Sequence, residues 1–230
     1  MKGFGTLLLL FIGPAVASST DDSRDEFWPE LDTYINLNTA ARLRLLGAFR
    51  NNQQGESWHG DFGAFIDVAL KPVFRRELRQ REDVFDKRFL SFQSGFRYIS
   101  RLGAGPPYLE HRWIVELTAR YPLPGHFILS DRNRGEFRFI SKMPFAPRYR
   151  NKFQLEKDFR MGDLAYTPYL STELFYDTRY DAWVRNRYSA GVQFPVGGYM
   201  VFQPYYLRHN QSRSSPVHVN AFGLELEVYF

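Results

Sequence analysis

The sequence has 230 residues, of which 44% are hydrophobic and 17% are aromatic, and it contains no cysteine. Without cysteine this sequence forms no disulfide, offers no thiolate metal ligand and has no N-terminal Cys to which a lipid could be attached. The net charge of +5 comes from Lys and Arg scattered among carboxylates, and this pattern argues against a nucleic-acid-binding protein.

Residues 1–17 have the pattern of a secretory signal peptide. Lys2 precedes an apolar run from Leu7 to Ile12, and Ala15-Val16-Ala17 forms a small-x-small cleavage site. We expect cleavage near Ala17, followed by a short acidic segment at residues 18–26 and a single domain at residues 27–230. No later stretch reaches about 18 uninterrupted apolar residues, so any integration into a membrane must use strands.

Alternation of polar and apolar residues with period 2 recurs through the mature chain, broken by Gly, Pro, Asn and Asp clusters. It predicts eleven strands: Glu30 to Asn38, Arg42 to Arg50, Asp61 to Leu70, Phe89 to Ser100, Leu109 to Tyr121, Phe127 to Ile140, Arg148 to Phe159, Ala165 to Tyr176, Val184 to Val196, Tyr199 to Leu207 and His218 to Phe230. The charged stretch at residues 73–88 reads as a loop or a short helix. Bacterial single-chain barrels have even strand numbers, so we expect that one strand is missed or wrongly assigned, near the N-terminus or within 73–88.

The strand from Leu109 to Tyr121 has one apolar face and one charged face. Trp113 and Tyr121 lie eight residues apart on the apolar face, which corresponds to roughly 20 Å of height in a tilted strand. Two aromatic girdles flank the lipid band of an outer-membrane barrel, which is about 25 Å tall. The predicted fold is therefore all-β, an antiparallel transmembrane β-barrel of the bacterial outer membrane with about 10 to 12 strands. A secreted, soluble β-sandwich that binds a ligand is the alternative, because alternation alone does not distinguish lipid from a protein core.

The last predicted strand alternates strictly and ends in an aromatic residue. Its apolar face consists of Phe222, Leu224, Leu226, Val228 and Phe230. This pattern resembles the C-terminal signature of Gram-negative outer-membrane proteins. The resemblance implies recognition by the barrel-assembly machinery and a location in the outer membrane.

If each apolar face contacts lipid, the opposite faces fill the lumen with nearly balanced charges. The lumen-lining charges that we single out as candidates are Arg112, Glu116, Arg134, Glu136, Arg138, Arg148, Arg150, Glu173, Arg185 and Arg187. The same assignment places inside the barrel Arg42, Arg44, Arg50, Arg97, Arg120 and Lys152, together with Glu30, Asp32, Asp61, Asp67, Glu110, Glu156, Glu225 and Glu227. Two interpretations follow: a lumen braced by Arg–carboxylate pairs, or a narrow channel for small solutes in which surplus Arg favours anions.

Several short strings together resemble one uncharacterised family. They are Arg134-Gly-Glu136-Phe-Arg138, Arg148-Tyr-Arg150, Pro168-Tyr-Leu-Ser-Thr-Glu173-Leu-Phe, Asn186-Arg187-Tyr-Ser-Ala-Gly191-Val and the opening Phe27-Trp28-Pro-Glu30-Leu. The chain is similar in these segments to the outer-membrane barrels catalogued as domain of unknown function 2490. The resemblance implies a barrel fold and an outer-membrane location, and it carries no established activity.

Catalytic candidates are few. His209 and Ser212 are distantly similar to the His-x-Ser segment of outer-membrane lipid deacylases, although no carboxylate lies near them in sequence. A lipid hydrolase using this pair is the enzymatic alternative, and His59 beside Asp61 is a weaker acid–base candidate. We find no phosphate-binding loop, metal-ligand cluster or dinucleotide fingerprint. We therefore expect a protein that is not an enzyme, without metal or cofactor, whose partners are outer-membrane lipids, the barrel-assembly machinery and a small solute.

Overall fold

The computed structural model describes residues 23–52, 57–71, 88–103, 107–213 and 217–230. The strands in these residues are β1 (Ser23–Asn36), β2 (Ala41–Asn52), β3 (Ser57–Lys71), β4 (Leu90–Gly103), β5 (Leu109–Leu123), β6 (Phe127–Ile140), β7 (Arg148–Lys157), β8 (Phe159–Met161), β9 (Leu164–Asp177), β10 (Ala182–Val196), β11 (Met200–Gln211) and β12 (His218–Tyr229). The described part of the chain contains no helix long and apolar enough to cross a membrane.

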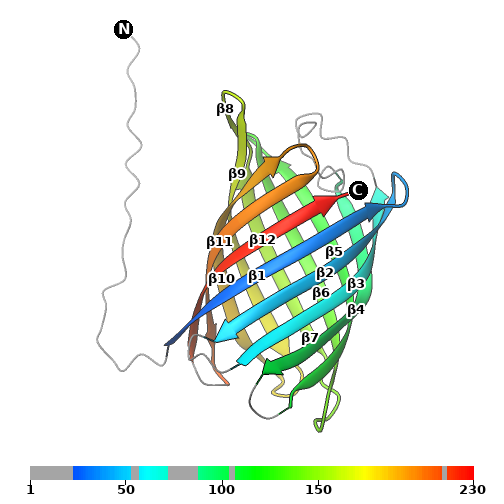
Figure 1. Cartoon of the computed structure of the whole chain (residues 1–230), viewed down its shortest axis with the longest axis vertical. Coiled ribbons are helices and arrows are strands. Elements are labelled where there is room, and N and C mark those ends of the chain that lie inside the picture. Colours follow the sequence, from blue (N-terminus) through cyan, green and yellow to red (C-terminus); the bar gives the residue numbers. More distant parts are fainter. Residues whose placement is uncertain (1–22, 53–56, 72–87, 104–106, 214–216) are drawn as a thin grey trace.

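The sheet closes on itself into a barrel (Figure 1). Each wall strand pairs with its neighbours in chain order, β9 pairs with both β7 and β10, and β12 pairs with β1. The short β8 pairs only with the first residues of β9, and the two project together beyond the wall (Figure 1). The other eleven strands form the closed barrel. Because the sheet is one closed cylinder, the alternative of a soluble β-sandwich is wrong.

An odd number of strands closes because β1 and β12 pair in parallel, with a register that runs from Ser23 opposite His218 to Tyr34 opposite Tyr229. In an up-and-down sheet of odd strand number, the first and last strands point the same way, and Figure 1 shows β1 in blue beside β12 in red. Our expectation of an even count was therefore wrong for the wall described. Of the segment 73–88, in which we looked for a further strand, only Arg88 lies among the described residues.

The first strand begins earlier than the alternation predicted. β1 starts at Ser23, so residues 23–26 of the expected acidic segment belong to the wall.

The two ends of the barrel are named after the direction of β1. The N-terminal rim is the edge where β1 and β12 begin, and the C-terminal rim is the edge where both end, beside the short connections at residues 37–40, 124–126 and 197–199.

Stacked aromatic rings hold the parallel seam on both of its faces. Inside, the rings of Tyr34 and Tyr229 stack with centroids 4.9 Å apart, and outside, Phe27 and Phe222 stack at 6.3 Å. The Phe230 amide donates to the Tyr34 carbonyl oxygen at 2.8 Å. Parallel pairing is slightly less stable per residue than antiparallel pairing, and stacked rings of this kind contribute about 0.5–1.5 kcal/mol each.

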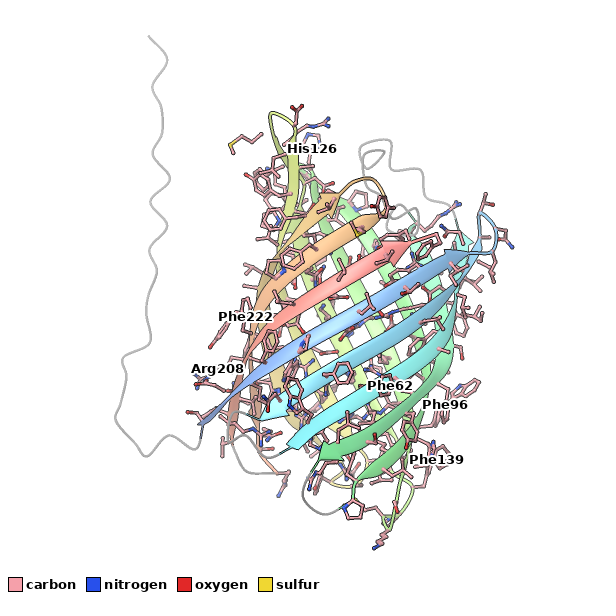
Figure 2. The ribbon with its side chains drawn as sticks, viewed as in Figure 1. Phe62, Phe96, His126, Phe139, Arg208 and Phe222 are labelled. Carbon is pink, nitrogen blue, oxygen red and sulfur yellow. The ribbon has the colours of Figure 1, made fainter. Side chains whose placement is uncertain are left out.

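The outer face carries many exposed apolar side chains around the barrel. Figure 2 shows Phe62, Phe96, Phe139 and Phe222 on the outside, and all four are exposed. Trp113 and Tyr121, which the sequence placed on the lipid face, are 48% and 42% exposed. An apolar band of this kind fits contact with acyl chains.

Outward ring pairs gather toward the two rims. Trp183 contacts Tyr149 and Tyr176 near the N-terminal rim, with centroids 6.1 Å and 5.6 Å away. Phe89 meets Tyr121 at 5.1 Å near the C-terminal rim. Aromatic girdles at both interfaces are typical of outer-membrane barrels.

A polar patch interrupts the outer face on β6 and β7. The Asn151 amide donates to Asp131 at 2.8 Å and to Asn133 at 3.1 Å, and the Tyr149 hydroxyl also donates to Asn133. These side chains satisfy one another, as polar groups in apolar surroundings must.

Candidate functional site in the barrel lumen

The inward positions of β5, β6 and β7 carry alternating Arg and Glu, and the strand register brings them into contact. Glu136 lies opposite Arg148 and beside Arg150. Its carboxylate accepts from Arg148 Nε at 2.8 Å and from Arg150 Nη1 at 2.7 Å, and Arg112 Nη1 lies 3.5 Å away. Glu136 is 1% exposed, so one buried carboxylate holds three guanidinium groups.

The contacts continue from Glu136 toward the C-terminal rim. Arg150 also contacts Glu173 at 2.7 Å, and Arg132 contacts the same carboxylate at 2.8 Å. Arg132 in turn lies 3.6 Å from Glu116, which accepts from Arg134 Nε at 2.6 Å. The network therefore joins strands that are not neighbours in the sheet.

A second branch runs toward the N-terminal rim. Arg138 Nε donates to Glu110 at 2.6 Å, and its Nη1 lies 3.3 Å from Asp177. Asp177 also accepts from Arg179 at 2.7 Å, in the connection between β9 and β10. The hydrogen bonds that Arg179 donates to Asp177 raise the pKa of Arg179 above its ordinary value. We call the ion pairs of both branches, from Glu116 to Asp177, the lumenal network.

Phe175 lies at the centre of the Arg-rich wall. It is 2% exposed, and the guanidinium carbons of four arginines lie over its ring: Arg148 at 5.6 Å, Arg150 at 4.6 Å, Arg185 at 5.4 Å and Arg187 at 5.2 Å. A cation over an aromatic face is stabilised by about 0.5–2 kcal/mol, more when it is desolvated. Phe175 thus packs the lumen where like charges would otherwise repel.

The wall around β1 to β4 carries separate pairs. Arg44 donates to Asp32 through Nε at 2.9 Å and Nη2 at 2.5 Å, in a bidentate arrangement. Arg42 donates to Asp67 at 2.8 Å. These short contacts between buried or partly buried groups brace adjacent strands, as the first of our two interpretations of the lumen requires.

The structure places all ten predicted lumen-lining charges on the inner face. Arg112, Glu116, Arg134, Glu136, Arg138, Arg150 and Glu173 are buried, and Arg148, Arg185 and Arg187 are partly buried. All except Arg185 join the lumenal network, Arg187 through a contact of 3.4 Å with Glu173. Arg185 donates instead to Gln211 at 2.7 Å.

Sequence reasoning missed three members of the lumenal network. Arg132 has the same parity as Arg134 on β6, so the alternation already pointed it inward. Asp177 lies one residue beyond the predicted end of its strand, and Arg179 lies in the following connection. The last two therefore carried no alternation signal.

A cavity of about 310 Å³ extends from the middle of the barrel toward the C-terminal rim. Its lining includes Lys152, Arg187, Tyr205, Glu225 and Glu227. Glu110, Arg138, Phe175 and Asp177 do not line it, and they occupy the lumen on the side of the N-terminal rim. The lumen is thus filled in one part and hollow in the other.

Two charges in the cavity lack an ion-pair partner among the described residues. The Lys152 ammonium lies 5.9 Å from the centroid of the Tyr169 ring, and in the described structure it is within ion-pair distance of no carboxylate, although Glu173 lies opposite it in the strand register. The Glu225 carboxylate accepts a hydrogen bond from Gln203 Nε2 at 2.8 Å and contacts no cation. Most other lumenal charges are paired, so these two stand apart.

Glu225 belongs to a group of three carboxylates. One oxygen from each of Glu30, Asp32 and Glu225 lies within 4.8 Å of the others, and these are the residues that could hold a cation. Arg44 already contacts two of them, at 2.5 Å from Asp32 and 3.6 Å from Glu30. The group therefore needs less positive charge than its three carboxylates suggest.

The catalytic candidates are not brought together. His209 is 6% exposed and packs against Trp28, and its Nδ1 has no hydrogen-bond partner in the described structure. The Ser212 hydroxyl is exposed and donates to the Val184 carbonyl at 3.4 Å. Acyl transfer needs a hydrogen bond between nucleophile and base, and this geometry does not supply one.

The other acid–base candidate is occupied as well. Asp61 accepts from Arg97 Nε at 2.8 Å, and His59 packs against the ring of Tyr108 at 6.0 Å. Asp61 therefore neutralises a buried guanidinium instead of orienting the imidazole of His59.

A closed sheet with an apolar exterior and an ion-paired interior defines the class: this is a transmembrane β-barrel of the outer-membrane type. The family described as "Protein of unknown function (DUF2490)" matches residues 85–220, and the chain belongs to it. No curated protein matches the chain.

The solved structures that align with the chain include these two. The β domain of the Bordetella autotransporter BrkA aligns with a TM-score of 0.50 and 12% identity, over 81% of this chain and 83% of that one. LpxR from Salmonella typhimurium aligns with a TM-score of 0.48 and 8% identity, over the same shares of the two chains. At these identities the BrkA likeness bears on the fold alone.

Proposed function

We propose that the protein resides in the outer membrane of a Gram-negative bacterium and that fixed ion pairs close its lumen to free diffusion. Small charged solutes enter the cavity but do not diffuse freely through the barrel. One observation carries this proposal: Glu110, Arg138, Phe175 and Asp177 fill the lumen between the cavity and the N-terminal rim with side chains that are almost inaccessible to solvent.

The barrel size supports a closed lumen. Eight strands leave an interior just filled by side chains and about sixteen leave an aqueous channel, so an eleven-stranded wall encloses a space that long Arg side chains can fill. A buried charge without its partner is costly, and thermal motion therefore separates such pairs rarely.

The proposed location rests on the export pattern of residues 1–17 and on the apolar exterior. Outer-membrane lipids surround the barrel, and the barrel-assembly machinery recognises β12 through its outward face, which ends in Phe230. Expression with the native N-terminus followed by membrane fractionation tests this. We expect a protein processed near Ala17 in the outer-membrane fraction, and an unprocessed protein in the inner membrane would contradict the proposal.

Closure of the lumen is tested in planar bilayers. We expect the wild-type protein to produce no discrete conductance steps in concentrated KCl. Phe175→Ala removes the ring that packs four arginines and should produce frequent steps. Leu174→Ala, on the outward face of the same strand, is the matched control and should behave like the wild type. Regular steps from the wild-type protein would overturn the closed lumen.

A narrow anion-selective channel is the second candidate, and the composition of one wall favours it. Basic side chains outnumber carboxylates at the inward positions of β6, β7, β9 and β10, with Arg132, Arg134, Arg138, Arg148, Arg150, Lys152, Arg185 and Arg187 facing Glu136, Glu156, Glu173 and Asp177. Such a wall attracts anions.

Lys152→Glu tests the anion channel best, because Lys152 has no ion-pair partner in the described structure and its replacement breaks no pair. Charge reversal at Arg134, Arg138 or Arg150 would instead break existing ion pairs with Glu116, Glu110 and Glu136. If wild-type steps appear in a salt gradient, the reversal potential of Lys152→Glu should shift toward cations. An unchanged reversal potential would reject the anion channel.

A further inference from the structure

The two lumenal charges without ion-pair partners line the same cavity and have opposite signs. Lys152 is on β7 and Glu225 is on β12, and three strands, β9, β10 and β11, separate them in the sheet. A charge kept in a confined space without a partner is costly. Neither residue contacts the other, so the cavity presents a cationic site and an anionic site on different walls.

We infer that this cavity binds a small zwitterion, whose carboxylate or other anionic group meets Lys152 and whose ammonium group meets Glu225. This rests on the proposed function in that the solute enters a lumen that does not let it pass freely. At about 310 Å³ the cavity is at the lower end of small-molecule pockets, which span about 300–1,000 Å³.

The groups around each charge fit the same ligand. The carboxylate of Glu30 lies beside Glu225, and the ring of Tyr205, opposite Gly223 on the neighbouring strand, lines the same cavity. Carboxylates and an aromatic face are the groups that stabilise an ammonium ion. This end of the cavity therefore selects a cationic group.

On the other wall, Lys152 is accompanied by Arg187, whose Nε is buried without a hydrogen-bond partner in the described structure. Lys and Arg are the side chains that bind carboxylate and phosphate groups. An anion without a positive group would meet this wall but leave Glu225 unpaired, and a simple cation would leave Lys152 unpaired. A molecule with both charges satisfies both sites at once.

Calorimetric titration of the refolded protein in detergent micelles tests the inference. The probes are glycine, β-alanine, γ-aminobutyrate and 6-aminohexanoate, which separate the two charges by increasing lengths. Each is compared with the carboxylate and the amine of the same carbon chain. We expect the ω-amino acid of best-fitting length to bind at least roughly tenfold tighter than either single-charge analogue, because each charge-assisted contact adds about that factor.

Two substitutions should separate the ends of the cavity. Lys152→Gln should weaken the zwitterion roughly tenfold and leave the amine unchanged, and Glu225→Gln should weaken the zwitterion and leave the carboxylate unchanged. Lys142→Gln, in an exposed turn at the N-terminal rim, is the matched control and should bind like the wild type. A general loss of structure would weaken all probes together.

Three results would each overturn the inference. None of the ω-amino acids binds, a carboxylate binds as tightly as its zwitterion, or Lys152→Gln binds the zwitterion as tightly as Lys142→Gln. The bilayer recordings keep it separate from the proposed function. An open wild-type pore that still binds the zwitterion would reject the closed lumen alone, and a silent barrel that binds none of the probes would reject the zwitterion site alone.

Discussion

Glu136 is the residue whose replacement should reveal most about the interior of the barrel. Its carboxylate contacts Arg148 at 2.8 Å, Arg150 at 2.7 Å and Arg112 at 3.5 Å. We consider Glu136→Gln, which keeps the shape of the side chain and removes its charge.

The expected cost follows from what each arginine retains. Arg150 keeps Glu173 at 2.7 Å, and Arg112 keeps Glu110 at 2.9 Å. Arg148 contacts no other carboxylate in the described structure. The substitution therefore leaves one partly buried guanidinium without a counterion, and removing one partner of a buried pair costs about 3–5 kcal/mol.

Equilibrium unfolding by urea in phospholipid vesicles measures this cost. Trp113 and Trp183 are 48% and 53% exposed on the outer face, so their fluorescence reports departure from lipid. We expect Glu136→Gln to lower the free energy of unfolding by about 3–5 kcal/mol. The double variant Glu136→Gln/Arg148→Gln removes the orphaned charge and should recover about 1–3 kcal/mol, the range of couplings between contacting residues.

Glu225→Gln is the matched control, because it removes the same charge from an inward position that contacts no cation in the described structure. It should change the stability by less than about 1 kcal/mol. If Glu136→Gln costs no more than Glu225→Gln, water already screens the lumenal network. The reasoning that these ion pairs close the lumen would then be refuted.

Three further variants test other contacts. In Gly223→Ala the new methyl group overlaps the ring of Tyr205, so unfolding in urea should be easier by about 1–3 kcal/mol; Gly47→Ala, with open space beside it, should not show this loss. Phe230→Ala removes the ring of the proposed assembly signal, so less folded protein should reach the outer membrane, as scored by the heat-modifiable band on gels; equal amounts would contradict that role. Ser212→Ala should release as much fatty acid from outer-membrane lipids as the wild type, and a loss of release would revive the hydrolase.

Alternation predicted the face of almost every wall residue, because successive side chains of a strand point to opposite sides. On β5 it separated Leu117, which is 41% exposed, from Ile114 and Glu116, which are buried. The positions of the inward charges could therefore be predicted from the sequence. The family to which the protein belongs was also predicted from short motifs such as Arg134-Gly-Glu136-Phe-Arg138.

The partners of these charges could not be predicted. Alternation fixes the face of a residue but not the register between strands, and register decides whether Arg150 meets Glu136, Glu173 or neither. For the same reason the sequence did not distinguish Lys152 and Glu225 from the paired charges around them. The cavity could not be predicted from the alternation either. Its volume depends on which side chains extend across the lumen, and the alternation does not specify this.

The parallel seam explains why β12 is ordered as far as its final residues. Pro29 and Pro204 both lie opposite Leu224, so at this height neither neighbour of β12 has a backbone N–H to donate. Parallel pairing is also the weaker kind. Stacked rings inside and outside the seam and the hydrogen bond from the Phe230 amide to Tyr34 offset this weakness. An open edge cannot persist in hydrocarbon, so the alternation that runs to Phe230 is the part of the sequence that closes an odd-numbered wall.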